Sequence, residues 1–124
     1  MRPDAELRLP AEAAYVSVLR ATAVSLAARL DFTVDDLEDL RMAVSEAAGL
    51  VLEQAPEGGT LEAAFAFGDG RVTVRVGTVT DSPVPVPRDD FAWQVLSALT
   101  VDAGCETTED AVTVTFTIVS LVAA

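Results

Sequence analysis

Two neighbouring segments in which apolar and polar residues alternate constrain the fold of this chain most strongly. In residues 60–67, the apolar side chains on one face are Leu61, Ala63, Phe65 and Phe67. In residues 71–78, the matching positions are Val72, Val74 and Val76. The segment between them, Gly68-Asp69-Gly70, favours a hairpin turn because Asp-Gly tolerates positive φ. We therefore predict an antiparallel pair of strands with one buried face, which needs a covering layer.

Two segments with helical spacing predict that covering layer. Residues 10–29 carry a stripe at 3.6-residue spacing, formed by Tyr15, Leu19, Thr22, Leu26 and Leu30. Residues 33–54 carry a second stripe, formed by Leu37, Leu40, Val44, Ala47, Val51 and Ala55. Thr33 and Asp36 have the spacing of a capping box, with Asp in place of the usual Glu, and they mark the start of the second helix. The sequence Pro-Glu-Gly-Gly at residues 56–59 ends it.

Three further strands complete the predicted sheet. Residues 6–9 form the first strand, and residues 101–106 and 111–119 form a last pair. The order of strand, two helices, hairpin, helix and hairpin predicts an α+β fold, a two-layer sandwich. In it the helices cover one face of a mixed, mostly antiparallel sheet. The 124 residues contain no internal repeat, and we expect residues 1–124 to form a single domain.

A connector and a short helix separate the hairpin from the last pair of strands. Three prolines alternate in residues 83–87, which makes the connector stiff and extended. Asp89 or Asp90 then caps a helix that ends near Leu99. The apolar side of this helix carries Phe91, Val95, Leu96 and Leu99. Trp93 lies on a neighbouring side.

Charge and residue usage narrow the classes of function. The net charge of −12 opposes binding to nucleic-acid phosphates and favours a basic protein partner. The absence of histidine removes the commonest general base and the commonest zinc ligand. A single cysteine, Cys105, fits a reducing compartment and is expected to be a small buried residue. Because no apolar run approaches about 20 residues and the N-terminus does not resemble a signal peptide, we expect a cytoplasmic protein without a membrane partner.

One segment is distinctive enough to indicate a family. Leu40-Arg41-Met42-Ala43-Val44-Ser45-Glu46-Ala47 resembles the helix that carries the catalytic glutamate in RsbW-like anti-sigma factors. These proteins are serine kinases of the GHKL fold, the histidine-kinase-like ATPase or Bergerat fold. The resemblance covers nearly the whole chain, including Leu7-Arg8-Leu9-Pro10-Ala11 and Val18-Leu19-Arg20. It implies that Arg20 contacts both a sigma factor and its antagonist, and that Glu46 is the general base if the kinase is active.

The same resemblance implies that the nucleotide site has decayed. The family's magnesium-binding asparagine falls on Leu50, whose side chain offers no oxygen to a cation. The aspartate that reads the adenine falls on Gly77, and the long ATP lid has shrunk to the proline connector. The glycine-rich phosphate box is replaced by a segment with Asp89 and Asp90, which would compete with a triphosphate for the helix N-terminus. We therefore expect ATP and magnesium binding to be lost or weak, and we assign no cofactor-binding or metal-binding residue.

The last helix points to one subgroup of the family. Residues 91–99, Phe-Ala-Trp-Gln-Val-Leu-Ser-Ala-Leu, resemble a helix of actinobacterial stress anti-sigma factors whose nucleotide motifs are degenerate. Trp93 either fills the core space left by the absent nucleotide or anchors an interface, where aromatic residues are enriched.

Three hypotheses for the function follow from the resemblance. In the first, the protein is a binding module that sequesters an alternative RNA polymerase sigma factor in a stress response. An anti-anti-sigma protein with a STAS domain counters it by partner switching. The alternative is an active ATP-dependent serine kinase of that antagonist, and the third is a diverged GHKL-type regulatory domain with an unrelated partner. The joint loss of metal, adenine and phosphate contacts favours the first.

The resemblance also implies a homodimer. The sheet face away from the helices is the physical candidate for its interface. The small side chains on that face are Ala64, Ala66, Thr73, Thr113, Thr115 and Thr117.

Overall fold

The computed structural model describes residues 1–120 and confirms the α+β prediction. Five strands form one sheet in the order β1-β2-β3-β5-β4. Their bounds are β1 Ala5–Pro10, β2 Thr60–Gly68, β3 Arg71–Val79, β4 Val101–Thr107 and β5 Ala111–Val119. Every neighbouring pair is antiparallel, so the sheet is not mixed. The strands β3 and β4 run in the same direction, but they are not neighbours because β5 lies between them.

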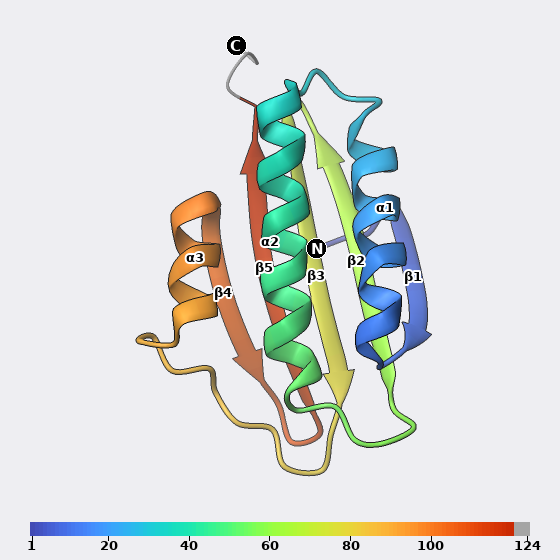
Figure 1. The fold of residues 1–124 in the computed structure, drawn as a ribbon, viewed down its shortest axis with the longest axis vertical. Helices are drawn as coiled ribbons and strands as arrows, with labels where there is room; N and C mark the ends of the chain where they lie inside the picture. Colours follow the sequence, from blue (N-terminus) through green and yellow to red (C-terminus); the bar gives the residue numbers. More distant parts are fainter. Residues whose placement is uncertain (121–124) are drawn as a thin grey trace.

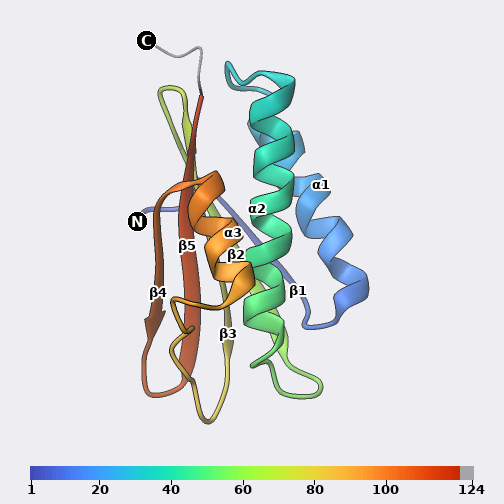
Figure 2. The same cartoon turned by 60° about the vertical axis from the view of Figure 1, so that its left-hand side comes forward.

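The helices form a second layer on one face of this sheet (Figures 1 and 2). They are α1 Val16–Ala27, α2 Val34–Leu52 and α3 Phe91–Leu99, and a short 3₁₀ turn at Ala13–Tyr15 precedes α1. The long helix α2 crosses the middle of the sheet, with α1 on the β1 side and α3 on the β4 side (Figure 1). None of the helices in residues 1–120 is long and apolar enough to span a membrane.

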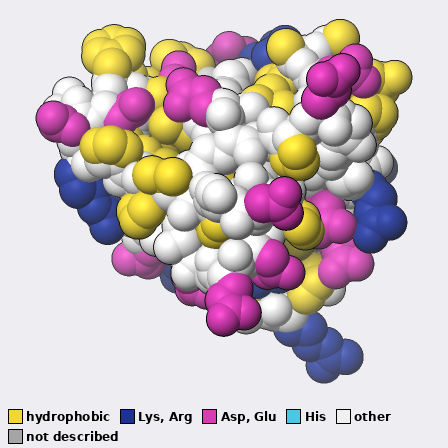
Figure 3. All heavy atoms as spheres, turned by 90° about the horizontal axis from the view of Figure 1, so that it is seen from below, with side chains coloured by type: hydrophobic (Ala, Val, Ile, Leu, Met, Phe, Trp, Pro, Cys, Tyr) yellow, Lys and Arg dark blue, Asp and Glu magenta, His cyan; other side chains and the backbone are white. Residues whose placement is uncertain are grey.

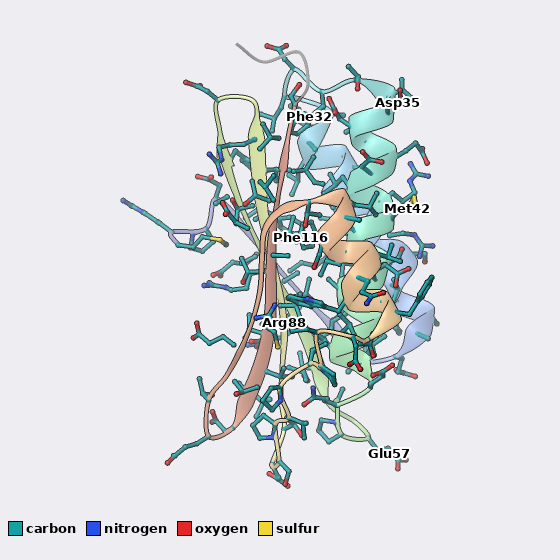
Figure 4. The ribbon with its side chains drawn as sticks, turned by 90° about the vertical axis from the view of Figure 1, so that its left-hand side faces the viewer. Phe32, Asp35, Met42, Glu57, Arg88 and Phe116 are labelled. Atoms are coloured by element: carbon teal, nitrogen blue, oxygen red, sulfur yellow. The ribbon has the colours of Figure 1, made fainter. Side chains whose placement is uncertain are left out.

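The core lies between the two layers. The predicted inward faces of the strands are confirmed: Phe65, Val74 and Phe116 are fully buried. Figure 4 shows Phe116 between the sheet and the helices, and Met42 on the outer side of α2. Cys105 is half-buried against the same core.

The buried face of α1 differs from the predicted stripe. Its buried side chains are Leu19, Ala23 and Ala27, whereas Tyr15 is exposed. Tyr15 lies in the 3₁₀ turn before α1, which has about three residues per turn, so it does not continue the α-helical stripe. Within α1 the buried side chains follow one another at four-residue spacing, and Leu26 flanks this face and is half-buried. Alanines on the buried face also permit close packing of α1 against α2.

The start of α2 confirms the capping box. The backbone N–H of Asp36 donates to Thr33 Oγ1 at 3.0 Å, and the N–H of Thr33 donates to Asp36 Oδ2 at 2.9 Å. Asp36 is buried and also lies 3.3 Å from the hydroxyl of Ser120, just after β5. The aspartate of the capping box therefore links the start of α2 to the end of β5.

The connector and α3 agree with prediction in outline. Residues 80–90 form no helix or strand, and Asp90 is the N-cap of α3. The expected apolar side is partly wrong, because Phe91 is 78% exposed while Trp93 is 4% exposed. Phe91 is the first helical residue and faces solvent, and the buried pair is Trp93 and Leu96, three residues apart. Trp93 therefore fills core space.

Candidate functional site

The predicted catalytic residue lies on the flank of α2 that faces α3. Glu46 is half-buried, and within residues 1–120 its carboxylate makes no hydrogen bond or ion pair. Helical geometry places Leu50 one turn later on the same flank. Leu50 is 2% exposed and belongs to the same buried cluster as Trp93 and Leu96. The position that would hold magnesium is therefore an apolar contact between two helices.

Gly77 lies on the face of the sheet opposite these helices, so a side chain at this position would not point toward them. A Cβ atom at Gly77 would lie 3.0 Å from Thr113 Oγ1, on the outer face. The inward positions beside it are Val76 and Thr78, both buried. The Thr78 hydroxyl donates to the carbonyl oxygen of Thr60 at 2.8 Å. This end of β3 therefore offers no carboxylate to the helix side.

The N-terminus of α3 is already occupied by an internal carboxylate. Asp90 Oδ1 accepts from the backbone N–H of Ala92 at 2.9 Å and from that of Trp93 at 3.3 Å. Asp89 adds a second, exposed carboxylate beside it. The guanidinium of Arg88 lies 4.6 Å above the Trp93 ring, at the cation–π distance, and Figure 4 shows Arg88 at the lower end of α3.

These residues do not fit a magnesium–nucleotide complex. The metal position carries a leucine, and the inward end of β3 carries a valine and a threonine. The helix N–H groups that would meet a phosphate already bond to Asp90. Among residues 1–120, no three acidic or cysteine side chains gather closely enough to hold a metal ion.

A second candidate site lies between α1 and α2 and contains Arg20. The Nη1 of Arg20 donates to Ser45 Oγ at 3.2 Å, and that hydroxyl donates to the carbonyl oxygen of Arg41 at 3.1 Å. A groove of about 410 Å³ opens here, lined by Ser17, Arg20, Ala21, Val24, Ser25 and Arg41. We call it the arginine groove. Its floor of small residues leaves two guanidinium groups accessible to another molecule.

Arg41 is the member of this groove that sequence reasoning missed. Its Nη2 lies 3.9 Å from Glu38 Oε1, at the limit of an ion pair, and both side chains are about half exposed. Within the described residues, no carboxylate lies within ion-pair distance of Arg20. Arg41 precedes Ser45 by four residues, so the two share the α1-facing flank of α2. That spacing was the available signal.

The outer face of the sheet holds a hollow of about 520 Å³ above Ala64, Gly77 and Thr113. Two acidic and two basic side chains surround it, Glu6, Glu62, Arg8 and Arg75. Arg8 Nη2 lies 3.1 Å from Glu62 Oε1. Farther along the face, the hydroxyls of Thr73 and Thr117 share a hydrogen bond of 2.9 Å. This face therefore combines small side chains with charges of both signs.

The chain as a whole carries more acidic than basic side chains. Figure 3, seen from the end where β3 leaves the sheet, shows acidic side chains across the surface and arginines mainly near its edges. The eight basic residues against twenty acidic ones produce this imbalance. The arginine groove, in contrast, is lined by two arginines and no acidic side chain.

Comparisons with known proteins bear on both sites. No protein-family model matches the chain. It is similar to the serine-protein kinase RsbW of Halalkalibacterium halodurans, with 37% identity over 87 residues, which are 69% of this chain and 52% of that protein. It is also similar to RsbW of Bacillus thuringiensis, with 38% identity over 63 residues, or 51% of this chain and 39% of that protein. The chain thus spans about half the length of these relatives, or less.

A solved structure has the same fold. The crystal structure of the RsbU and RsbW domains of a Mycobacterium tuberculosis protein matches with a TM-score of 0.69 and 21% identity. The match covers 94% of this chain and 32% of that one. The likeness therefore extends over nearly the whole two-layer fold described above.

Proposed function

Because this chain is RsbW-like in sequence and GHKL-like in fold, we propose that it is an anti-sigma factor. It binds an alternative sigma factor, of the kind used in stress responses, and keeps it from RNA polymerase. An anti-anti-sigma protein with a STAS domain releases the sigma factor by competing for the same surface. These events place the protein in the cytoplasm, where transcription takes place.

The observation that carries this proposal is the arginine groove. In a molecule with a net charge of −12, Arg20 is held by a neutral hydroxyl and not by a carboxylate. Its positive charge remains available to an acidic side chain of a partner, and a desolvated charge pair of this kind is strong. Arg41 supplies a second positive charge in the same groove. We assign Arg20 as the principal partner contact and Arg41 as its neighbour.

The acidic remainder of the surface supports a second feature of the proposal. A net charge of −12 attracts basic protein surfaces and accelerates their encounter with this chain. The same charge repels nucleic-acid phosphates, so inhibition acts on the sigma factor and not on DNA. Raising the salt concentration therefore slows association, because the Debye length falls from about 10 Å at 0.1 M to about 3 Å at 1 M.

An active kinase is the second candidate function. The relatives are named serine-protein kinases, and Glu46 lies on α2 where a general base of that family is expected. Against it stand the apolar Leu50 and the internal cap of α3 by Asp90. Incubation with Mg-ATP and the STAS proteins of the host separates the two: serine phosphorylation that disappears in Glu46→Ala supports the kinase.

We also propose that the protein forms a homodimer through the outer face of the sheet. A two-fold interface must be complementary to itself. Around the hollow above Ala64 and Gly77, acidic and basic side chains stand in equal number, so a second copy can pair each charge with its opposite. The threonines of β5 on this face are short enough for close approach of two sheets.

Capture of endogenous partners tests the proposal as a whole. The wild-type chain and an Arg20→Ala variant are immobilised, and the proteins retained from a lysate of the host are identified by mass spectrometry. We expect an alternative sigma factor and a STAS protein on the wild type, and both depleted on the variant. Retention of neither on the wild type would remove the anti-sigma assignment.

A further inference from the structure

The resemblance places the family's magnesium ligand at Leu50 and its phosphate box at the start of α3, and the chain's own side chains occupy both positions. Leu50 from α2 and Trp93 and Leu96 from α3 are buried in the core, and α2 packs against α3. Val86 of the connector is half-buried against the same core. We call these four side chains the plug. The guanidinium of Arg88 covers the Trp93 ring from outside.

A pair of hydrogen bonds fastens the connector over the plug. Gln54, just after α2, donates through Nε2 to the carbonyl oxygen of Val84 at 2.7 Å. Its Oε1 accepts from the N–H of Val84 at 2.8 Å. Because residues 83–87 alternate proline and valine, only Val84 and Val86 carry backbone N–H groups there. Gln54 uses one of these two donors, and we call this pair of bonds the latch.

The N-terminus of α3 is the third part of this arrangement, beside the plug and the latch. Asp90 accepts from two of the N–H groups that an anion would otherwise meet at a helix start. The carboxylate is part of the chain and is therefore present in every state of the protein. A phosphate would have to displace it and approach the neighbouring Asp89.

From these three observations we propose that the plug, the latch and the Asp90 cap are a built-in replacement for the nucleotide. They hold α2, the connector and α3 in the arrangement that a bound nucleotide would otherwise stabilise. The fold is then complete without ATP, and nucleotide does not change it. The inference rests on the proposed function for one consequence only: partner exchange proceeds by competition, without a nucleotide cycle.

Trp93 makes the inference directly measurable, because it is the only tryptophan in the chain and belongs to the plug. Its fluorescence emission and the melting temperature of the full chain are recorded while Mg-ATP or Mg-ADP is added to millimolar concentration. We expect neither quantity to change. A shift of emission and melting temperature at micromolar nucleotide would overturn the inference.

The latch is tested with a pair of glutamine variants. Gln54→Ala removes both bonds to Val84, whereas Gln94→Ala removes an exposed glutamine of α3 whose side chain makes no hydrogen bond within residues 1–120. In Gln54→Ala we expect hydrogen exchange at the Val84 amide to be about tenfold faster, and Trp93 to be more readily quenched by acrylamide. Gln94→Ala is expected to match the wild type.

Identical exchange and quenching in the two variants would show that the connector is not fastened by Gln54, and would contradict the latch. None of these measurements includes a sigma factor. Failure of the latch therefore leaves the anti-sigma proposal standing, and failure of sigma binding leaves the latch standing.

Discussion

At the scale of single residues, the principal partner contact that we propose is Arg20. We expect Arg20→Ala to weaken sigma-factor binding by about 2 kcal/mol or more, because a methyl group replaces a guanidinium buried in the interface. Arg29→Ala is the matched control, since Arg29 Nη1 bonds to the carbonyl oxygen of Ser25 on its own helix. Calorimetry compares the variants, and circular dichroism confirms that each is folded. Equal affinities for both variants would remove the contact assigned to Arg20.

Leu50 tests a different claim, that the family's magnesium position has been lost. Leu50→Asn places an amide in an apolar contact, and we expect the free energy of unfolding to fall by about 2–4 kcal/mol. Leu50→Met is the control and is expected to cost less than about 1.5 kcal/mol, because it conserves volume. Urea denaturation measures both. If magnesium and ATP restored the stability of Leu50→Asn, a nucleotide site would still be present.

At the scale of elements, the N-terminus of α2 connects the helical layer to the sheet. Asp36→Ala removes the reciprocal capping bonds with Thr33 and a contact with Ser120, so we expect the free energy of unfolding to fall by about 1–3 kcal/mol. Asp35→Ala is the control, because Asp35 is exposed in the same turn. The stabilities of the two variants are measured by thermal melting. Equal losses of stability would contradict this account.

Which elements could be predicted from sequence depends on how local their determinants are. The β2–β3 hairpin and the capping box of α2 are fixed by residues within a few positions of one another, and both predictions are confirmed. The buried face of α1 was not predictable from the spacing of large apolar residues, because two of its three buried side chains are alanines.

The predictions of the functional sites were limited in the same way, because the sites depend on residues far apart in the sequence. The resemblance aligned Gly77 with the adenine-reading aspartate by sequence position alone, and such an alignment does not include the face of the sheet, which changes with a shift of one residue. Arg41 was not singled out, because the groove it shares with Arg20 forms only when α1 packs beside α2. The bond between Gln54 and Val84 joins positions 30 residues apart, and no local pattern marks it.

At the scale of the whole molecule, the outer face of the sheet is the dimer interface that we propose. We expect the wild-type chain to sediment as a dimer and Thr115→Arg to sediment as a monomer, because a long charged side chain prevents close approach of two sheets. Ser97→Arg adds the same charge on an exposed position of α3 and is expected to remain dimeric. A dimer that survives Thr115→Arg would place the interface elsewhere.

The central claim is that this molecule binds a sigma factor as a folded protein without nucleotide. The most direct test is to titrate the alternative sigma factors of the host into the purified chain in nucleotide-free buffer and to measure binding by calorimetry. We predict binding of at least one sigma factor, with the same affinity after Mg-ATP is added and with Glu46→Ala in place of the wild type. Binding of none, or binding that appears only with Mg-ATP, would contradict the account.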